Sequence, residues 1–236
     1  MSLLDKCDWE KIRLELQQDG FAITNKPVIT KQQATSFKKS FSQEELYRRT
    51  IDMARYNMGK GVYKYFAYPL PSSVQELREQ SYEKLVGLAN EWNVRMKYKR
   101  EFPESLASFQ RAQKKIGQVR PTPLILRYEA GDFNSMHQDV FGDSYFPFQM
   151  IVGLTEFQKD YTGGELVLIK TRPRAQSLPY ILQIPFTHAV ILASSRHPQP
   201  GKKGFYQTGL KHGVAEIKSG ERFTLGIIFH DYKERN

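Results

Sequence analysis

The amino-acid sequence predicts an α+β protein, in which a helix-rich N-terminal half precedes a strand-rich C-terminal half. Before about residue 120 the apolar residues recur mainly at helical spacing, whereas from Thr122 onward short apolar runs are separated by turn residues. Helical and extended segments do not alternate regularly, which argues against a parallel sheet with crossover helices. With 40% hydrophobic and 13% aromatic residues, the chain can also bury a sizeable core.

Helices and one short strand are expected in the first half. The first helix begins at Trp9, places Ile12 and Leu16 on one face, and ends at Asp19-Gly20. A short strand is expected at 21–23. Further helices are expected at 31–47, broken near Ser42, at 72–96 and at 103–115.

Eight short strands are expected in the second half. They lie at about 122–128, 146–156, 164–170, 181–184, 188–193, 205–211, 213–217 and 222–230. Turn residues occupy 129–134 and 218–221. Eight short strands fit a jelly roll. We therefore expect one integrated domain, with residues 1–120 as a mainly helical support region packed on a core of residues 121–236.

A His-x-Asp tripeptide and a distant histidine form a candidate metal site, consisting of His137, Asp139 and His212. Two imidazoles and one carboxylate can hold a ferrous ion on one face and leave three positions open. A His-x-Asp tripeptide alone is weak evidence, because a loop histidine beside a capping Asp is its ordinary interpretation. Here it follows a predicted strand and turn, which is where rigid scaffolds often present ligands.

The other histidines are less suitable as ligands. His188 falls in the predicted strand at 188–193 and is expected to be a buried structural residue. His197 lies in a predicted loop, either exposed or near the substrate. His230 is either structural or directed into the cavity. We prefer His212, because a predicted strand, turn and returning strand follow it and bring Arg222 into the same cavity from a neighbouring strand.

Arg222 is the candidate partner for an anionic co-substrate. A planar guanidinium donates two hydrogen bonds to one carboxylate, which suits the distal carboxylate of 2-oxoglutarate. The ordinary interpretation of Arg222 is a surface ion pair with Glu221 or Glu216. Tyr128 could donate a hydroxyl hydrogen bond to the same acid. Further candidates for the substrate side are Gln149, Arg196 and Gln207.

Several segments resemble a known family. Arg127-Tyr128-x-x-Gly131, followed by His137-x-Asp139, resembles the opening of AlkB-type and prolyl-hydroxylase-type dioxygenases. Longer segments resemble more closely a bacterial family of 2-oxoglutarate/Fe(II) oxygenases that is proposed to modify nucleic acids. These segments are 61–70, 120–128, 137–139, 163–165 and 225–231.

The resemblance extends from about residue 20 to the C-terminus and carries several implications. It implies a double-stranded β-helix core and a dioxygenase that uses Fe(II), 2-oxoglutarate and O2. It further implies that iron is bound by His137, Asp139 and His212, and the co-substrate by Arg222. The chain departs from the family's pattern at Thr187-His188, where Gly-Asp is usual, and at Gln207 and Gly209, where Arg and Asn are common.

The charge of the chain favours an anionic partner. Thirty-five Lys and Arg residues against 25 Asp and Glu residues give a formal net charge of +10, which suits phosphate backbones. The segment 55–68 interleaves cations with aromatic residues, as single-stranded DNA or RNA requires. Packing of these aromatics onto the core is an equally good interpretation. The glycines at 59 and 61 indicate a mobile loop, suitable as a lid over the iron.

Composition also bears on the compartment. No apolar run approaches the ~20 residues of a membrane span, and the N-terminal residues do not resemble a signal peptide. With Cys7 as the single cysteine, no intrachain disulfide can form. We therefore expect a cytoplasmic protein without membrane partners. The sequence does not specify an oligomeric state.

The expected function is hydroxylation or oxidative demethylation of a substrate, most simply a nucleic-acid base. Two alternatives remain open at this point. One is the same chemistry on a protein side chain or small metabolite. The other is a non-catalytic metal-binding β-sandwich that binds nucleic acid.

Overall fold

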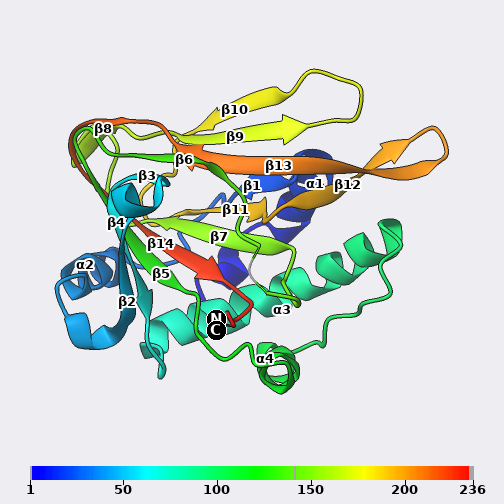
Figure 1. Ribbon diagram of the computed structural model, residues 1–236, viewed down its shortest axis with the longest axis horizontal. Coiled ribbons are helices and arrows are strands. Elements are labelled where there is room, and N and C mark those ends of the chain that lie inside the picture. Colours follow the sequence, from blue (N-terminus) through cyan, green and yellow to red (C-terminus); the bar gives the residue numbers. More distant parts are fainter. Residues whose placement is uncertain (1, 141, 234–236) are drawn as a thin grey trace.

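Two antiparallel sheets face each other, with helices on the outer face of the larger one (Figure 1). The computed structural model describes residues 2–140 and 142–233. The larger sheet has the order β1-β11-β7-β14-β5-β4-β2, with β8 paired to β14. The smaller sheet has the order β10-β9-β13-β6-β3, with β12 paired to β13. This is the predicted α+β architecture with a jelly-roll core.

Both sheets draw strands from distant parts of the chain. The larger sheet consists of β1 (Phe21–Ile23), β2 (Tyr47–Asp52), β4 (Val62–Phe66), β5 (Leu124–Glu129), β7 (Phe148–Gly153), β8 (Tyr161–Gly163), β11 (Ala189–Ala193) and β14 (Ile217–Ile228). The smaller sheet consists of β3 (Gly59–Lys60), β6 (Phe133–His137), β9 (Leu166–Thr171), β10 (Leu178–Leu182), β12 (Arg196–Gly201) and β13 (Gly204–Val214).

Within residues 2–140 and 142–233 the chain forms four α-helices: α1 (Trp9–Asp19), α2 (Lys31–Ser40), α3 (Ser72–Arg95) and α4 (Leu106–Lys115). In α1, the Asp8 side chain accepts a hydrogen bond from the Lys11 amide, and Gly20 ends the helix at φ +81°. The longest of these helices, α3, runs along the larger sheet (Figure 1). Its Trp92 ring packs against that of Phe148, with the ring centroids 4.4 Å apart. Among the described residues, no helix is both long enough and apolar enough to span a bilayer.

Several sequence predictions of local structure were wrong. The predicted helix at 31–47 ends at Ser40, and β2 begins at Tyr47. Of the two glycines predicted to form a mobile loop, Gly59 lies in β3, which pairs with β6. Gly61 lies between β3 and β4, and β4 pairs with β2 and β5. The predicted turn at 218–221 lies inside β14, where it pairs with β8. In each case strand pairing overrides the local helix or turn signal.

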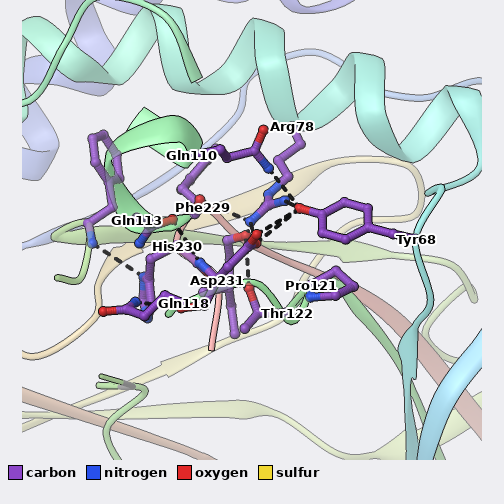
Figure 2. A network of polar contacts seen from close by, with 12 residues as sticks. Tyr68, Arg78, Gln110, Gln113, Gln118, Pro121, Thr122, Phe229, His230 and Asp231 are labelled. Atoms are coloured by element: carbon purple, nitrogen blue, oxygen red, sulfur yellow. Dashed lines mark hydrogen bonds and ion pairs between the residues drawn. The ribbon is translucent and has the colours of Figure 1, made fainter. Parts of the chain in front are cut away.

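A buried polar network connects α3 to the end of β14 (Figure 2). The Arg78 guanidinium donates to the carbonyl oxygens of Ile228 and Phe229, both at 2.9 Å, and to the Asp231 carboxylate at 2.8 Å. The Tyr68 hydroxyl donates to Asp231 at 2.9 Å. Since a buried charge is costly without a partner, the network fixes the end of β14 firmly to the helical layer.

Candidate metal centre

A cavity of about 350 Å³ opens between the two sheets. It is lined by His137, Asp139, His212, Tyr128 and Arg222, the five residues that the sequence singles out. His137 and His212 belong to the smaller sheet, and Asp139 belongs to the loop after β6. Tyr128 and Arg222 belong to the larger sheet. The cavity therefore has a candidate metal side and a candidate anion side.

On the metal side, the backbone register brings two imidazoles together. His137 ends β6 and is the direct cross-strand partner of His212 on β13, with ring centroids 4.2 Å apart. Asp139 follows two residues after β6, and its carboxylate lies 3.7 Å from Nε2 of His137 and 3.2 Å from Nε2 of His212. One donor atom of each residue lies within 4.8 Å of the others.

The electrostatics suit a metal ligand set. Nδ1 of His137 lies 2.7 Å from the Ser135 carbonyl oxygen, so Nδ1 carries the proton and Nε2 has a free lone pair. Burial lowers the pKa of His137, and the charge of His212 lowers it further. Burial alone would raise the pKa of Asp139, but the neighbouring imidazoles of His212 and His137 hold it well below its usual range. Two imidazoles and one carboxylate match the facial donor set of a ferrous ion.

A residue that the sequence did not single out holds the metal-side loop. The Gln138 amide donates to the carbonyl oxygens of Ser195 at 3.0 Å and Leu210 at 2.9 Å. The Leu210 bond attaches the segment between His137 and Asp139 to β13, the strand that carries His212, and the Ser195 bond attaches it to the residue before β12. The glutamine is visible in the tripeptide, but only the fold shows what its side chain contacts.

On the anion side, Arg222 lies deep in the molecule, with 2% of its surface exposed. The surface ion pair considered for it does not form, because Glu221 pairs with Arg127 and Glu216 with Lys218. Nε of Arg222 is buried and has no hydrogen-bond partner among the described residues. A buried guanidinium nitrogen without a partner is unfavourable unless an anion is bound, so this position fits a carboxylate ligand.

Tyr128 lies opposite Arg222 in the pairing of β5 with β14, and the guanidinium carbon is 5.6 Å from the Tyr128 ring centroid. Burial raises the pKa of Tyr128 to about 12, so the hydroxyl stays protonated. The Asn134 amide donates to the Tyr128 oxygen at 3.2 Å. This leaves the hydroxyl proton of Tyr128 available for a ligand in the cavity.

Two glycines make room for the anion side. At Gly164, with φ +67°, a Cβ would collide with the Ile217 side chain and would lie 3.0 Å from Cδ of Arg222. At Gly61, with φ +122°, a Cβ would lie 2.8 Å from the Tyr128 ring. Both positions therefore require glycine for its conformation and for its lack of a side chain.

His212 and Arg222 do line one cavity, but not from neighbouring strands as the sequence suggested. They lie on β13 and β14, which belong to different sheets. Of the further substrate-side candidates, Gln149 lines the cavity, and its buried amide nitrogen has no hydrogen-bond partner among the described residues. Arg196 donates to Gln207 at 2.9 Å on the β12–β13 ladder, and neither residue lines this cavity.

The remaining histidines lie outside the cavity. His188 is half-buried and precedes β11, so its prediction as a buried strand residue was wrong. His197 is fully buried, 5.7 Å from Trp92 between ring centroids, and not in an exposed loop. His230 is structural, because its Nδ1 accepts a hydrogen bond from the Phe146 amide at 3.2 Å.

The segment 55–68 has two roles. Tyr63 and Tyr65 line the cavity. Lys64 is buried in an ion pair with Glu44, and Phe66 is part of the core. Tyr68 belongs to the polar network of Figure 2. The packing interpretation therefore holds for Lys64, Phe66 and Tyr68, whereas Tyr63 and Tyr65 face the cavity.

Comparison with known proteins gives a family and a fold. A family model described as "Oxygenase, catalysing oxidative methylation of damaged DNA" matches residues 61–232. The "Uncharacterized protein Rv2227" of Mycobacterium tuberculosis is 36% identical over 166 residues, which cover 70% of this chain and 71% of that protein.

Solved structures share the fold at low sequence identity. A prolyl hydroxylase from Trichoplax adhaerens matches with a TM-score of 0.61 and 11% identity, over 94% of this chain and 89% of that chain. A 2OG-Fe(II) oxygenase family oxidoreductase from Burkholderia pseudomallei matches with a TM-score of 0.55 and 14% identity, over 97% and 94% of the two chains.

Proposed function

The chain belongs to the Oxygenase-NA family, and on that premise we propose that it is a 2-oxoglutarate- and Fe(II)-dependent dioxygenase that oxidises a methylated base in nucleic acid. In this proposal His137, Asp139 and His212 hold the iron. Arg222 and Tyr128 bind the distal carboxylate of 2-oxoglutarate.

The observation that carries the proposal is that one cavity contains both halves of such a site. Three metal donors converge on one wall, and a buried guanidinium nitrogen that no described residue hydrogen-bonds lies on another. A metal-binding module without catalysis would need the three metal donors but not the buried guanidinium. The buried Arg222 therefore favours the dioxygenase over a non-catalytic β-sandwich.

The residues of the chain then have distinct tasks. Fe(II) and 2-oxoglutarate, when bound, supply the oxidising chemistry by coupling decarboxylation of the 2-oxo acid to oxidation of the substrate by O2. His137 presents Nε2 because the Ser135 carbonyl holds the proton of Nδ1. Arg222 and the protonated Tyr128 hydroxyl fix an acid between the sheets, and burial of both excludes water from its carboxylate.

Three features support a nucleic-acid substrate. The family description names damaged DNA. The net charge of +10 attracts phosphates. Tyr63 and Tyr65 present aromatic rings to the cavity, 5.3 Å apart between centroids, where an unstacked base can be held. We propose a single strand of DNA or RNA as substrate, because a base inside a duplex cannot reach the metal side.

The site of action that we propose is the cytoplasm. Ferrous iron is maintained in a reducing compartment, and the one cysteine, Cys7, is buried and free.

The experiment that tests the function is succinate release from 2-oxoglutarate by purified protein with Fe(II), ascorbate and oxygen. It is run with and without mixed methylated and unmethylated oligonucleotides. We expect release that rises several-fold with methylated oligonucleotides. Release that no oligonucleotide stimulates would retain the oxygenase and redirect the substrate to a protein or metabolite. No release from protein with confirmed bound iron would contradict the dioxygenase itself.

A further inference from the structure

A second cavity, of about 190 Å³, adjoins the first. The two cavities share Met58, Tyr63 and Tyr65 in their linings. We call this second cavity the outer cavity, and it is bounded mainly by β2 and β4. Strand β2 is the edge strand of the larger sheet and lies beside β4 (Figure 1). A ligand that reaches the metal side past Tyr63 and Tyr65 can therefore extend into the outer cavity.

A β-bulge directs two consecutive arginines into the outer cavity. In the pairing of β2 with β4, Tyr47 lies opposite Phe66 and Arg49 opposite Tyr65, so Arg48 is the extra residue of the bulge. In a regular strand, consecutive side chains point to opposite faces. A bulge redirects one of them, and both Arg48 and Arg49 line this cavity.

The two arginines differ in what they contact. Arg48 donates to the Pro121 carbonyl oxygen at 2.8 Å, and its guanidinium lies 4.6 Å from the Tyr65 ring centroid. It is therefore a fixed part of the wall. Arg49 is exposed, and no hydrogen bond or ion pair with another described residue engages its guanidinium. Arg49 is free to bind a ligand.

The rest of the lining suits a nucleotide. The described residues that line the outer cavity include no carboxylate, and they include the aromatic Tyr56 and Tyr232. Tyr56 has 50% of its surface exposed. A cation beside an exposed aromatic face matches the phosphate and the base of an unstacked nucleotide. An acidic peptide would use the arginines but would leave the aromatic faces without a partner.

We propose that the outer cavity binds the nucleotide next to the target base in a single strand. The Arg49 guanidinium binds the phosphate between the two nucleotides, and the neighbouring base stacks on Tyr56. Arg48 adds positive charge from its fixed position against Tyr65. This subsite rests on the proposed nucleic-acid substrate and adds to it a location and a minimum length, because a free nucleoside would leave the outer cavity unused.

The test measures binding, so that it does not depend on turnover. The probe is a fluorescein-labelled octadeoxythymidylate in which one of the two central bases is N3-methylated. It is added in the absence of oxygen to protein that holds Fe(II) and 2-oxoglutarate. In a series of these probes, each phosphate in turn is replaced by an uncharged methylphosphonate. Anisotropy gives the dissociation constant of each probe for the parent protein and for Arg49→Gln.

For the parent protein we expect that removing the charge of one phosphate linkage beside the methylated base weakens binding roughly tenfold. Arg49→Gln weakens binding of the unmodified probe to about the same extent. It lowers by about one the slope of the logarithm of the binding constant against the logarithm of the salt concentration, which we call the salt slope. In this variant, replacing that linkage no longer weakens binding further. Tyr56→Leu weakens binding roughly tenfold without changing the salt slope. Lys202→Gln, at the distant β12–β13 turn, is the charge-matched control and retains the full linkage penalty.

The outcomes separate the two proposals. A parent protein that does not bind the octamer contradicts the nucleic-acid substrate, and the subsite with it. A parent protein that binds but shows equal penalties at all linkages overturns the subsite alone. The same holds if Arg49→Gln retains the linkage penalty of the parent.

Discussion

His137 and His212 occupy directly opposite positions on β6 and β13, and their ring centroids are 4.2 Å apart. Because side chains alternate along a strand, a shift of one residue in this pairing would turn one imidazole away from the cavity. The register of two strands thus fixes two candidate ligands. The third, Asp139, lies after the end of β6, where no ladder holds it.

The first prediction concerns how Asp139 is positioned. Gln138 attaches its segment to the carbonyl oxygens of Ser195 and Leu210. We expect Gln138→Ala to weaken metal binding about tenfold, because loss of a residue that orients ligands commonly costs 10- to 100-fold. Titration with Co(II), followed by its visible absorption, measures the affinity.

The control for this variant is Gln207→Ala, which removes a glutamine amide from the surface of β13. It should bind Co(II) as the parent does. Equal affinities for Gln138→Ala and Gln207→Ala would show that the loop holds its position without the two bonds.

The second prediction concerns Arg222. Its replacement by glutamine removes the buried cation that we assign to 2-oxoglutarate. Loss of a buried charge-assisted pair costs about 2–5 kcal/mol, so the KM for 2-oxoglutarate should rise about 30-fold or more. Arg222→Lys keeps the charge but not the planar fork, and its KM should be intermediate. Initial rates of succinate formation against 2-oxoglutarate concentration give these values.

Arg127→Gln is the matched control for Arg222→Gln. Arg127 lies on the adjacent strand β5 but pairs with Glu221 at the surface. Its loss should leave the KM for 2-oxoglutarate within about twofold of the parent value, as is usual for exposed pairs. If Arg222→Gln behaved like Arg127→Gln, the acid would have to bind elsewhere.

Much of the fold follows from the sequence, because local signals determine it. The apolar spacing and the Gly20 stop predict α1 to within one residue, and the short apolar runs predict β5, β7, β9 and β11. Strands β2, β4 and β6 were missed. Each of them contains polar or charged residues that give no clear apolar run. Pairing with other strands therefore decides that these segments are extended.

The candidate site follows from the sequence to a similar degree. Residue types and the His-x-Asp spacing single out the metal donors, since the chemistry restricts the choice. What could not be predicted are the side chains that act through tertiary contacts. The Gln138 bonds depend on residues up to about 70 positions away in the chain. The bulge at Arg48 depends on the pairing of β2 with β4.

The third prediction concerns space beside Arg222. Gly164→Ala introduces a Cβ at φ +67° that collides with Ile217, so we expect a loss of stability of about 2 kcal/mol or more. Gly87→Ala is the matched control in helix α3, where a Cβ would meet no atom within 4 Å. It should stabilise the protein by about 0.5–1 kcal/mol. Urea unfolding followed by circular dichroism measures both, and two variants of equal stability would contradict the steric argument.

The last prediction concerns acid. Burial lowers the pKa of both His197 and His230 to about 3, whereas in the unfolded chain a histidine has a pKa of about 6.5. Below about pH 6.5 the unfolded state therefore binds protons that the folded state excludes. The free energy of unfolding should fall as the pH decreases from about 6.5 towards 3, by at most about 1.4 kcal/mol per pH unit for each histidine. His197→Gln removes one of these groups, so the difference in stability between pH 6.5 and pH 5 should shrink by about 1.6 kcal/mol. His188→Gln is the matched control, because it removes a half-buried histidine by the same substitution. Urea unfolding at a series of pH values tests this, and a His197→Gln profile as steep as that of the parent would show that His197 does not cause the acid sensitivity.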